Sequence, residues 1–177
     1  YTISRANIGE LPQMIPLVAD LGIQRFFIQV IGVRGRSAEQ KGDELQVSAR
    51  EWRDIVPPVA EEIARGGVKV TYPKVFLAPD ERFECAGRVA DNYFVFPNGR
   101  VYRCPLCEDY PLHSLAVEEN RLVETNKLNE TDLFQLDIPE GCVMNKLIQP
   151  DNICYAADGR PQNKIACCLL KEEVSSD

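Results

Sequence analysis

The cysteines are the residues of this chain whose type and spacing can do chemistry. Three of the seven lie in one short segment, CAGRVADNYFVFPNGRVYRCPLC, which covers residues 85–107. Cys104 and Cys107 enclose Pro and Leu, and two thiolates separated by two residues can bind one metal ion or one edge of a cluster. The segment therefore predicts a metal centre, a set of disulfides, or small side chains buried in a core.

The number of cysteines and the start of the sequence favour the metal centre. Seven is an odd number, so the cysteines cannot all pair within the chain. We see no secretory signal and expect a cytoplasmic, reducing compartment, where grouped cysteines bind metal more often than they form disulfides. Burial as small apolar residues stays open for four cysteines taken singly: Cys142, Cys154, Cys167 and Cys168. Because adjacent cysteines rarely bind one centre, we expect Cys167 or Cys168 to be structural.

A β-hairpin must position the first three thiols. Residues 93–96 and 101–103 are aromatic and β-branched and flank Pro-Asn-Gly-Arg, and Asn-Gly is the strongest short-range signal of a hairpin. The second strand ends at Cys104, and Cys85 lies far enough upstream to return beside that end. The sequence therefore predicts that Cys85, Cys104 and Cys107 converge.

Upstream of the hairpin, strands and helices alternate. Strand-like residues occur at 1–4, 25–31 and 68–72, separated by a helical pattern over 8–21 and by another that begins at a Ser48–Glu51 capping box. We expect Asn7 to cap the first helix with Glu10 as its partner, Pro16 to kink or shorten it, and Pro57-Pro58 to kink or split the second helix. Residues 32–46 are expected to form an irregular loop.

This alternation predicts parallel βα units, and hence an α/β fold. Three strands cannot close an eight-stranded barrel, so residues 1–78 are expected to form an open sheet or, as we favour, a piece of a larger α/β unit. From residue 79 to 177 cysteine and proline become frequent, which predicts a second, small Cys-rich domain containing the hairpin. Its polar stretch, 113–136, is expected to hold a short amphipathic helix, with the lone His113 an ordinary residue of a loop.

Composition excludes several classes of protein. The formal net charge is −7 and lysine and arginine are not clustered, so a nucleic-acid partner is not expected. Apolar residues make up 45% and charged residues 27%, which is typical of soluble globular chains. No run of eighteen apolar residues is present in the sequence, so a membrane partner is not expected either.

The cysteine spacing resembles that of SPASM and twitch domains, the auxiliary iron–sulfur modules at the C-terminus of many radical S-adenosylmethionine (radical SAM) enzymes. Cys85 is followed by thirteen residues, Gly99, four residues and Cys104, which is similar to the C-x(9–15)-G-x4-C element of these domains. The phrase FVFPNGRVYRCP also resembles that element. Upstream, YTISRAN, RFFIQVIGVRGRS and VKVTYP resemble the fourth to sixth strands of the partial (β/α)6 barrel of the same family.

The resemblance implies cofactors, partners and site residues. Cys85 and Cys104 would bind an auxiliary [4Fe–4S] cluster, with Cys107 as a third ligand and Cys142 or Cys154 as the fourth. Such a cluster binds substrate or relays electrons, so the parent enzyme would have a small-molecule or peptide substrate and an electron donor. Ser4, Arg5 and Gln29, with Arg34 close by in sequence, would contribute to the S-adenosylmethionine pocket of the parent, beside the ends of its strands.

The chain also departs from the family. It has no C-x3-C-x2-C loop, which binds the catalytic cluster, so we expect a C-terminal fragment that is not catalytically competent alone. Full SPASM domains continue with C-x2-C-x5-C-x3-C and a later Cys, whereas here the spacings after Cys107 are x34, x11 and x12. One auxiliary cluster is therefore expected rather than two. The alternatives are a zinc-stabilised binding module on the CPLC segment and two later cysteines, or an α+β domain whose thiols bind no metal.

Overall fold

The computed structural model describes residues 1–32 and 45–176. The chain divides into two compact units: unit 1 comprises Tyr1–Phe76 with Cys168–Asp177, and unit 2 comprises Leu77–Cys167. The expected division into 1–78 and 79–177 differs from this at the C-terminus, because the last ten residues belong with unit 1. The expected loop at 32–46 lies almost wholly outside the described residues, and so does Arg34.

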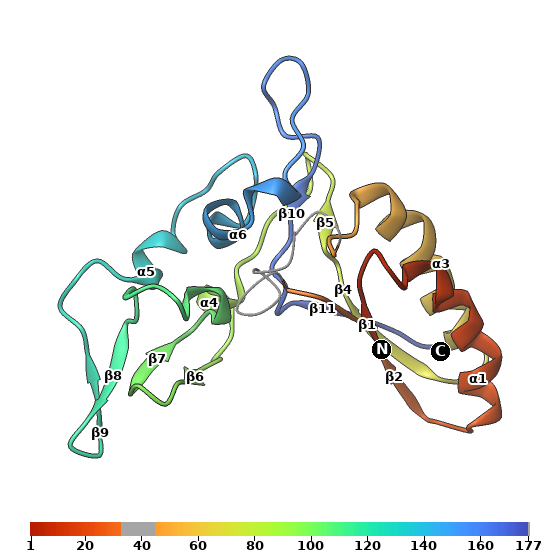
Figure 1. Cartoon of the computed structure of the whole chain (residues 1–177), viewed down its shortest axis with the longest axis horizontal. Coiled ribbons are helices and arrows are strands. Elements are labelled where there is room, and N and C mark those ends of the chain that lie inside the picture. The colour runs from red at the N-terminus through yellow and green to blue at the C-terminus, as the bar shows by residue number, and fades with distance from the viewer. Residues whose placement is uncertain (33–44, 177) are drawn as a thin grey trace. The chain divides into compact units, whose positions relative to one another are not determined.

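Unit 1 contains the parallel strands that the sequence predicted. Strand β1 (Thr2–Ile3) pairs with β3 (Gln29–Val30), and β2 (Arg25–Phe27) pairs with β4 (Lys69–Pro73), both parallel. The expected strand at 25–31 is thus divided between two small sheets. Strand β11 (Lys171–Val174) adds to the other edge of β4 in the antiparallel direction (Figure 1). The sheets are open, and the chain as described is a mixed α/β protein without a closed barrel.

The first helix of unit 1 differs from its prediction. Residues Ile8–Gln13 form a 3-10 helix, η1, and only Met14–Asp20 form an α-helix, α1. Asn7 precedes η1 but does not cap it with its side chain, so the predicted capping box with Glu10 is wrong. The Asn7 Oδ1 atom instead accepts a hydrogen bond from Ser4 N at 2.8 Å. Two prolines so close to the helix start remove N–H donors, which explains the short α-helical part.

The second helix is continuous. Helix α3 spans Ala49–Arg65 without a break, so the expected split at Pro57-Pro58 is wrong. The predicted capping box is confirmed: Ser48 Oγ accepts a hydrogen bond from Glu51 N at 3.2 Å, and Ser48 N donates to Glu51 Oε2 at 3.0 Å. A buried stripe holds the helix against the strands despite the two missing N–H donors: Trp52, Val56, Val59, Ala60, Ile63 and Ala64.

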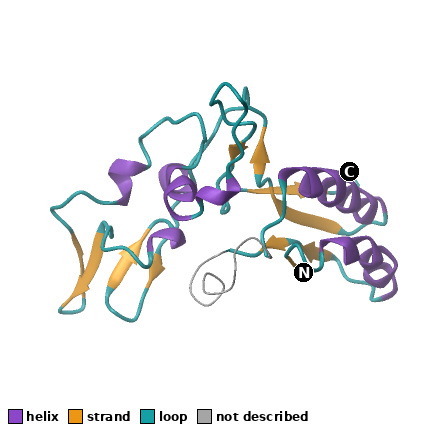
Figure 2. Ribbon diagram, turned by 45° about the horizontal axis from the view of Figure 1, so that its top comes forward, coloured by secondary structure: helices purple, strands orange, loops and turns teal. Residues whose placement is uncertain are grey.

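Unit 2 is built from short strands, single helical turns and loops (Figure 2). Strands β6 (Phe94–Val95), β7 (Arg100–Tyr102), β8 (Leu115–Glu118) and β9 (Arg121–Glu124) form an antiparallel sheet in that order. Its helical elements are α4 (Ala86–Val89), η3 (Pro105–Cys107), α5 (Glu130–Leu133), α6 (Val143–Ile148) and η4 (Pro150–Asn152). Strand β10 (Lys164–Ile165) pairs with β5 (Phe76–Leu77), within which the division between the units falls.

The polar stretch at 113–136 corrects another expectation. Residues 115–124 form the β8–β9 hairpin, and only Glu130–Leu133 form a helical turn. The turn residues Glu119 and Asn120 have φ values of 47° and 62°. Positive φ at both turn residues is the geometry of a type I′ turn, which matches the twist of a two-residue hairpin. Among the described residues, no helix is long and apolar enough to cross a lipid bilayer.

Candidate metal centre

Five cysteines of unit 2 lie at the ends of its short elements. Cys85, Cys104 and Cys142 are the residues immediately before α4, η3 and α6, Cys107 ends η3, and Cys167 follows β10 by two residues. Two pairs of these thiols are hydrogen-bonded, Cys85 with Cys167 and Cys104 with Cys107. All seven cysteines fall within the described part of the chain, and no disulfide is present there.

Cys85 and Cys167 form the first pair of thiols. The hydrogen bond between the two thiols is the main reason that the pKa of Cys85 is raised, and burial and the charge of Cys167 raise it further. The backbone N–H of Ala86 also donates to the Sγ atom of Cys167 at 3.4 Å. Cys142 lies close enough to raise the pKa of Cys85 through its charge. Its own Sγ atom accepts a hydrogen bond from Asn145 N at 3.4 Å.

Cys104 and Cys107 form the second pair. Their thiols are hydrogen-bonded, which with burial raises the pKa of Cys104 far above its usual range, and the charge of Cys167 adds to the effect. Cys107 N also donates to Cys104 O at 3.2 Å, which closes the CPLC turn. Cys167 is thus hydrogen-bonded to Cys85 and near enough to Cys104 for its charge to raise the pKa of that thiol.

The predicted hairpin positions the second pair. Phe94 lies opposite Tyr102 and Val95 opposite Val101, and Gly99 supplies the positive φ, 79°, that the turn requires. Cys104 then follows two residues after the fully buried Tyr102. The Tyr102 hydroxyl donates to the carbonyl of Tyr110 at 2.6 Å, which ties the segment after Cys107 back to the hairpin.

Two glycines position the remaining thiols. Gly87 lies in α4 beside the ring of Phe134, so closely that a Cβ atom there would be 2.4 Å from Cε2 of Phe134. Gly141 has a φ of 84°, and a Cβ there would lie 2.7 Å from the carbonyl oxygen of Ile165. Cys142 N donates to that same oxygen at 3.1 Å. These contacts place the chain before Cys142 alongside the strand that leads to Cys167.

A buried carboxyl group lies beside the CPLC turn. Glu130 is fully buried, and its Oε1 atom accepts hydrogen bonds from Arg103 N at 2.7 Å and from Ser114 Oγ at 3.0 Å. Burial raises the pKa of Glu130, while these bonds and the Cys107 thiol oppose the rise. Glu130 therefore holds the residue before Cys104 in place from the interior of the unit. Sequence analysis did not single it out, because its neighbours in sequence are those of a polar surface.

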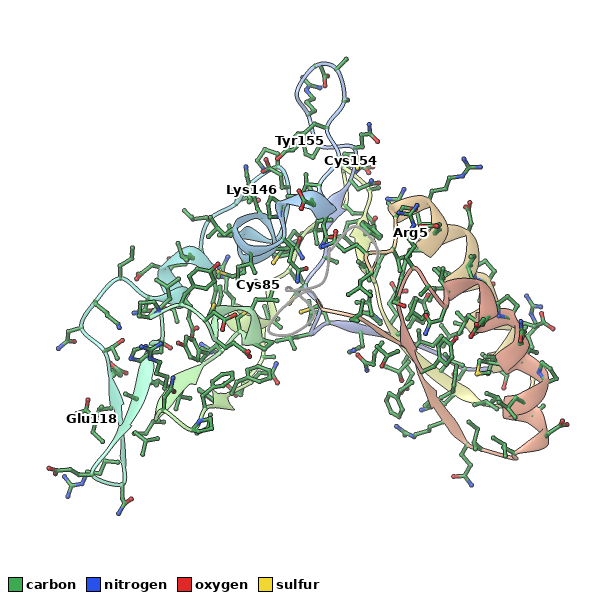
Figure 3. All side chains as sticks on the ribbon, viewed as in Figure 1. Arg5, Cys85, Glu118, Lys146, Cys154 and Tyr155 are labelled. Atoms are coloured by element: carbon green, nitrogen blue, oxygen red, sulfur yellow. The ribbon has the colours of Figure 1, made fainter. Side chains whose placement is uncertain are left out.

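The remaining candidates lie elsewhere. Cys154 is exposed, and Figure 3 shows it beside Tyr155 and well apart from Cys85. Cys168 belongs to unit 1.

His113 packs edge-on against the ring of Tyr102, with 5.8 Å between the ring centroids, and burial lowers the pKa of His113. The sequence predicted only that Cys167 or Cys168 is structural, and it gave no signal that Cys167 pairs with Cys85.

The residues expected near S-adenosylmethionine lie in unit 1. Ser4 and Arg5 follow β1 at its carboxyl end, and Gln29 lies opposite Thr2 in the neighbouring β3. Ser4 is engaged in a turn with Asn7, and the Gln29 Oε1 atom accepts a hydrogen bond from the Lys171 ammonium group. The structure thus places Ser4 and Arg5 just after β1 and Gln29 in the adjacent parallel strand β3.

Comparison of the chain with family models, curated proteins and solved structures gave no significant match. Within residues 1–32 and 45–176, no three His, Cys, Asp or Glu side chains are grouped closely enough to hold a single metal ion. What unit 2 does contain is five thiols arranged as two hydrogen-bonded pairs and one further neighbour. Its function must be inferred from this arrangement and from the resemblance of the hairpin.

Proposed function

We propose that the chain is the C-terminal part of a radical SAM enzyme and that unit 2 binds an auxiliary [4Fe–4S] cluster. The ligands are Cys85, Cys104, Cys107 and Cys167, with Cys142 as the alternative fourth. The observation that carries the proposal is the presence of two hydrogen-bonded thiol pairs in unit 2, Cys85 with Cys167 and Cys104 with Cys107, with Cys167 near enough to Cys104 for its charge to act there. The match of the segment from Cys85 to Cys104 with the SPASM element supports it.

The chemistry of these side chains suits a cluster better than a single ion. Iron–sulfur clusters are bound by cysteine thiolates, each on its own iron atom, so their ligands are spread around a larger object. A structural zinc ion needs four ligands whose sulfur atoms lie about 3.8 Å apart, given Zn–S bonds of about 2.3 Å in a tetrahedron. Each hydrogen-bonded pair of thiols is compatible with that spacing, but one zinc ion needs both pairs together. No three described residues are grouped for one ion. The zinc-stabilised module therefore remains the second candidate.

When bound, the cluster supplies electron transfer or an iron atom that a substrate can reach. The residues of the chain tune and protect that chemistry. The N–H groups of Ala86 and Asn145 donate to the sulfur atoms of Cys167 and Cys142, and hydrogen bonds to sulfur change the reduction potential of a cluster. Cys107 is fully buried, which keeps water from its sulfur atom.

Unit 1 would contribute residues to the S-adenosylmethionine site of the parent enzyme. Side chains at the carboxyl ends of parallel strands commonly form the site in α/β folds. Ser4 and Arg5 follow the carboxyl end of β1, and Gln29 begins the neighbouring β3. These three residues would line part of the S-adenosylmethionine pocket. The substrate would be a small molecule or a peptide, and a separate electron donor would reduce the clusters.

Metal and sulfide analysis of the chain after anaerobic reconstitution tests the proposal. We expect about four iron and four sulfide per chain, as a [4Fe–4S] cluster contains, and a brown colour that dithionite bleaches. Cys104→Ala and Cys167→Ala should lose the cluster. Cys154→Ala, a matched control at an exposed cysteine apart from the group, should retain it. Zinc without sulfide, or full iron loading of Cys104→Ala, would overturn the proposal. Loss of iron in Cys142→Ala but not in Cys167→Ala would make Cys142 the fourth ligand.

A further inference from the structure

Unit 2 contains a pocket of about 400 Å³ with Cys85 in its wall. The pocket lies between residues 82–89, residues 134–137 and Lys164. Its lining is of three kinds: the cations Arg82, Arg88 and Lys164, the carboxylates Glu84 and Asp137, and the apolar side chains Phe83, Val89, Phe134 and Leu136. Pockets of about 300–1,000 Å³ with apolar walls and a few polar groups are typical of small-molecule sites.

The charged groups of this pocket are available to a ligand. In the described part of the chain, the side chains of Arg82, Arg88, Glu84 and Asp137 form no ion pair or hydrogen bond. The Lys164 Nζ atom donates to the carbonyl of Glu81 at 2.7 Å, which holds the ammonium group and leaves two further donors. Unit 2 as a whole has nine Lys and Arg against fifteen Asp and Glu. The pocket has three cationic side chains against two carboxylates, so cations are concentrated there although the unit as a whole is acidic.

We propose that this pocket binds an amino acid or the end of a short peptide as a zwitterion. The ligand carboxylate contacts Arg82, Arg88 and Lys164, and its ammonium group contacts Glu84 and Asp137. An apolar side chain packs on Phe83 and Phe134. Binding itself does not depend on the cluster. That the ligand is the substrate of the enzyme rests on the proposed function, because Cys85 places it beside the cluster.

The mixed lining distinguishes this ligand from others. A phosphate ester would be held by the cations but repelled by Glu84 and Asp137. A neutral apolar ligand would cover five charged side chains without pairing them, which is costly. A cavity of about 150 Å³ is enough for benzene, so a volume of about 400 Å³ accommodates one amino acid or a dipeptide with its side chains.

Calorimetric titration of the full chain with L-leucyl-L-leucine tests the assignment. We expect saturable binding, and N-acetylation or C-amidation of the dipeptide should each weaken it about 10-fold, the effect of losing one charge-assisted hydrogen bond. Arg88→Gln should weaken binding of the free dipeptide by a similar factor but leave binding of its amide unchanged. Asp137→Asn should weaken binding of the free dipeptide but not of its N-acetyl form. Arg121→Gln, an exposed cation of β9, is the matched control and should change nothing.

The same variants separate the pocket from the cluster. Arg88 and Asp137 are exposed, so both substitutions should leave the circular dichroism spectrum and the iron content unchanged. Absence of binding at millimolar dipeptide, equal affinity for the capped forms, or tighter binding of phenyl phosphate would each overturn the pocket assignment. Dipeptide binding in a chain that takes up no iron would support the pocket and contradict the proposed function.

Discussion

The contact between Gly87 and Phe134 gives a sharp test of how the Cys85 segment is held. A Cβ atom at position 87 would lie 2.4, 2.6 and 2.9 Å from three ring atoms of Phe134, whereas carbon atoms in contact normally lie about 3.5–4.0 Å apart. The ring is buried and would have to move by about 1 Å. Overpacking of this kind costs about 1–3 kcal/mol, and replacing a helical glycine by alanine returns about 0.5–1 kcal/mol. Gly87→Ala should therefore destabilise unit 2 by about 1–2 kcal/mol.

Hydrogen exchange of the α4 amides measures this loss where it occurs. The N–H groups of Val89 and Ala90 donate to the carbonyls of Cys85 and Ala86 at 3.2 and 2.9 Å. A loss of about 1.4 kcal/mol corresponds to exchange about 10-fold faster at these two amides. Iron retention by the reconstituted chain should fall as well, because the turn that presents Cys85 is displaced.

A second substitution and a control complete the test. Phe134→Leu, combined with Gly87→Ala, should restore much of the protection, since the shorter side chain leaves room for the added methyl group. Gly9→Ala has no atom within 4 Å of the new Cβ and should be neutral or slightly stabilising. If Gly87→Ala exchanges at the wild-type rate, Phe134 does not constrain α4 and the account of this segment is wrong.

Two further predictions concern capping and burial. Ser48→Ala should destabilise unit 1 by about 1 kcal/mol. Unfolding in denaturant, monitored by the fluorescence of Trp52, measures this loss. Because Ser48 lowers the pKa of Glu51, the Glu51 carboxylate stabilises the fold above its ordinary pKa, and this stabilisation is lost as pH falls through the lowered value. An unchanged denaturation midpoint in Ser48→Ala would contradict the role of the cap. Burial raises the pKa of Glu130, so wild-type stability should decline as pH rises from about 4.3. In Glu130→Gln the amide oxygen can still accept hydrogen bonds from Arg103 and Ser114, and the decline of stability with pH should be smaller. An unchanged slope of stability against pH would contradict the raised pKa of Glu130.

Local sequence signals predicted the elements whose stability is local. The Asn-Gly hairpin formed as expected because Gly99 supplies the positive φ and the flanking residues favour strands. The Ser48–Glu51 capping box formed because both hydrogen bonds lie within one turn of helix. The parallel pairing of β2 with β4 followed from the alternation of strand and helix patterns.

Elements that depend on long-range contacts were missed. The Glu119-Asn120 turn lacks the glycine that usually marks a type I′ hairpin, so the hairpin was not predicted and only a short helix was expected within residues 113–136. Pro57-Pro58 stays within α3 because burial of its stripe outweighs the missing hydrogen bonds. Strand β11 reaches β4 from about a hundred residues away, and nothing in the local sequence indicates that partner.

The candidate site shows the same division between local and distant signals. Spacing in the sequence grouped Cys85 with Cys104 and Cys107, whereas in the structure the thiol of Cys85 is hydrogen-bonded to Cys167 and that of Cys104 to Cys107. The contribution of Cys167 depends on the bridge between Gly141 and Ile165, which joins segments distant in sequence. A single sequence carries no signal for such a bridge.

X-ray absorption at the iron edge of the anaerobically reconstituted chain tests the central claim most directly. We expect iron surrounded by sulfur, with a second shell of iron atoms, in the wild-type chain and in Cys154→Ala, and loss of both shells in Cys104→Ala. Iron bound only through oxygen and nitrogen, or a zinc edge with sulfur neighbours and no iron, would contradict the account of unit 2 as an iron–sulfur module.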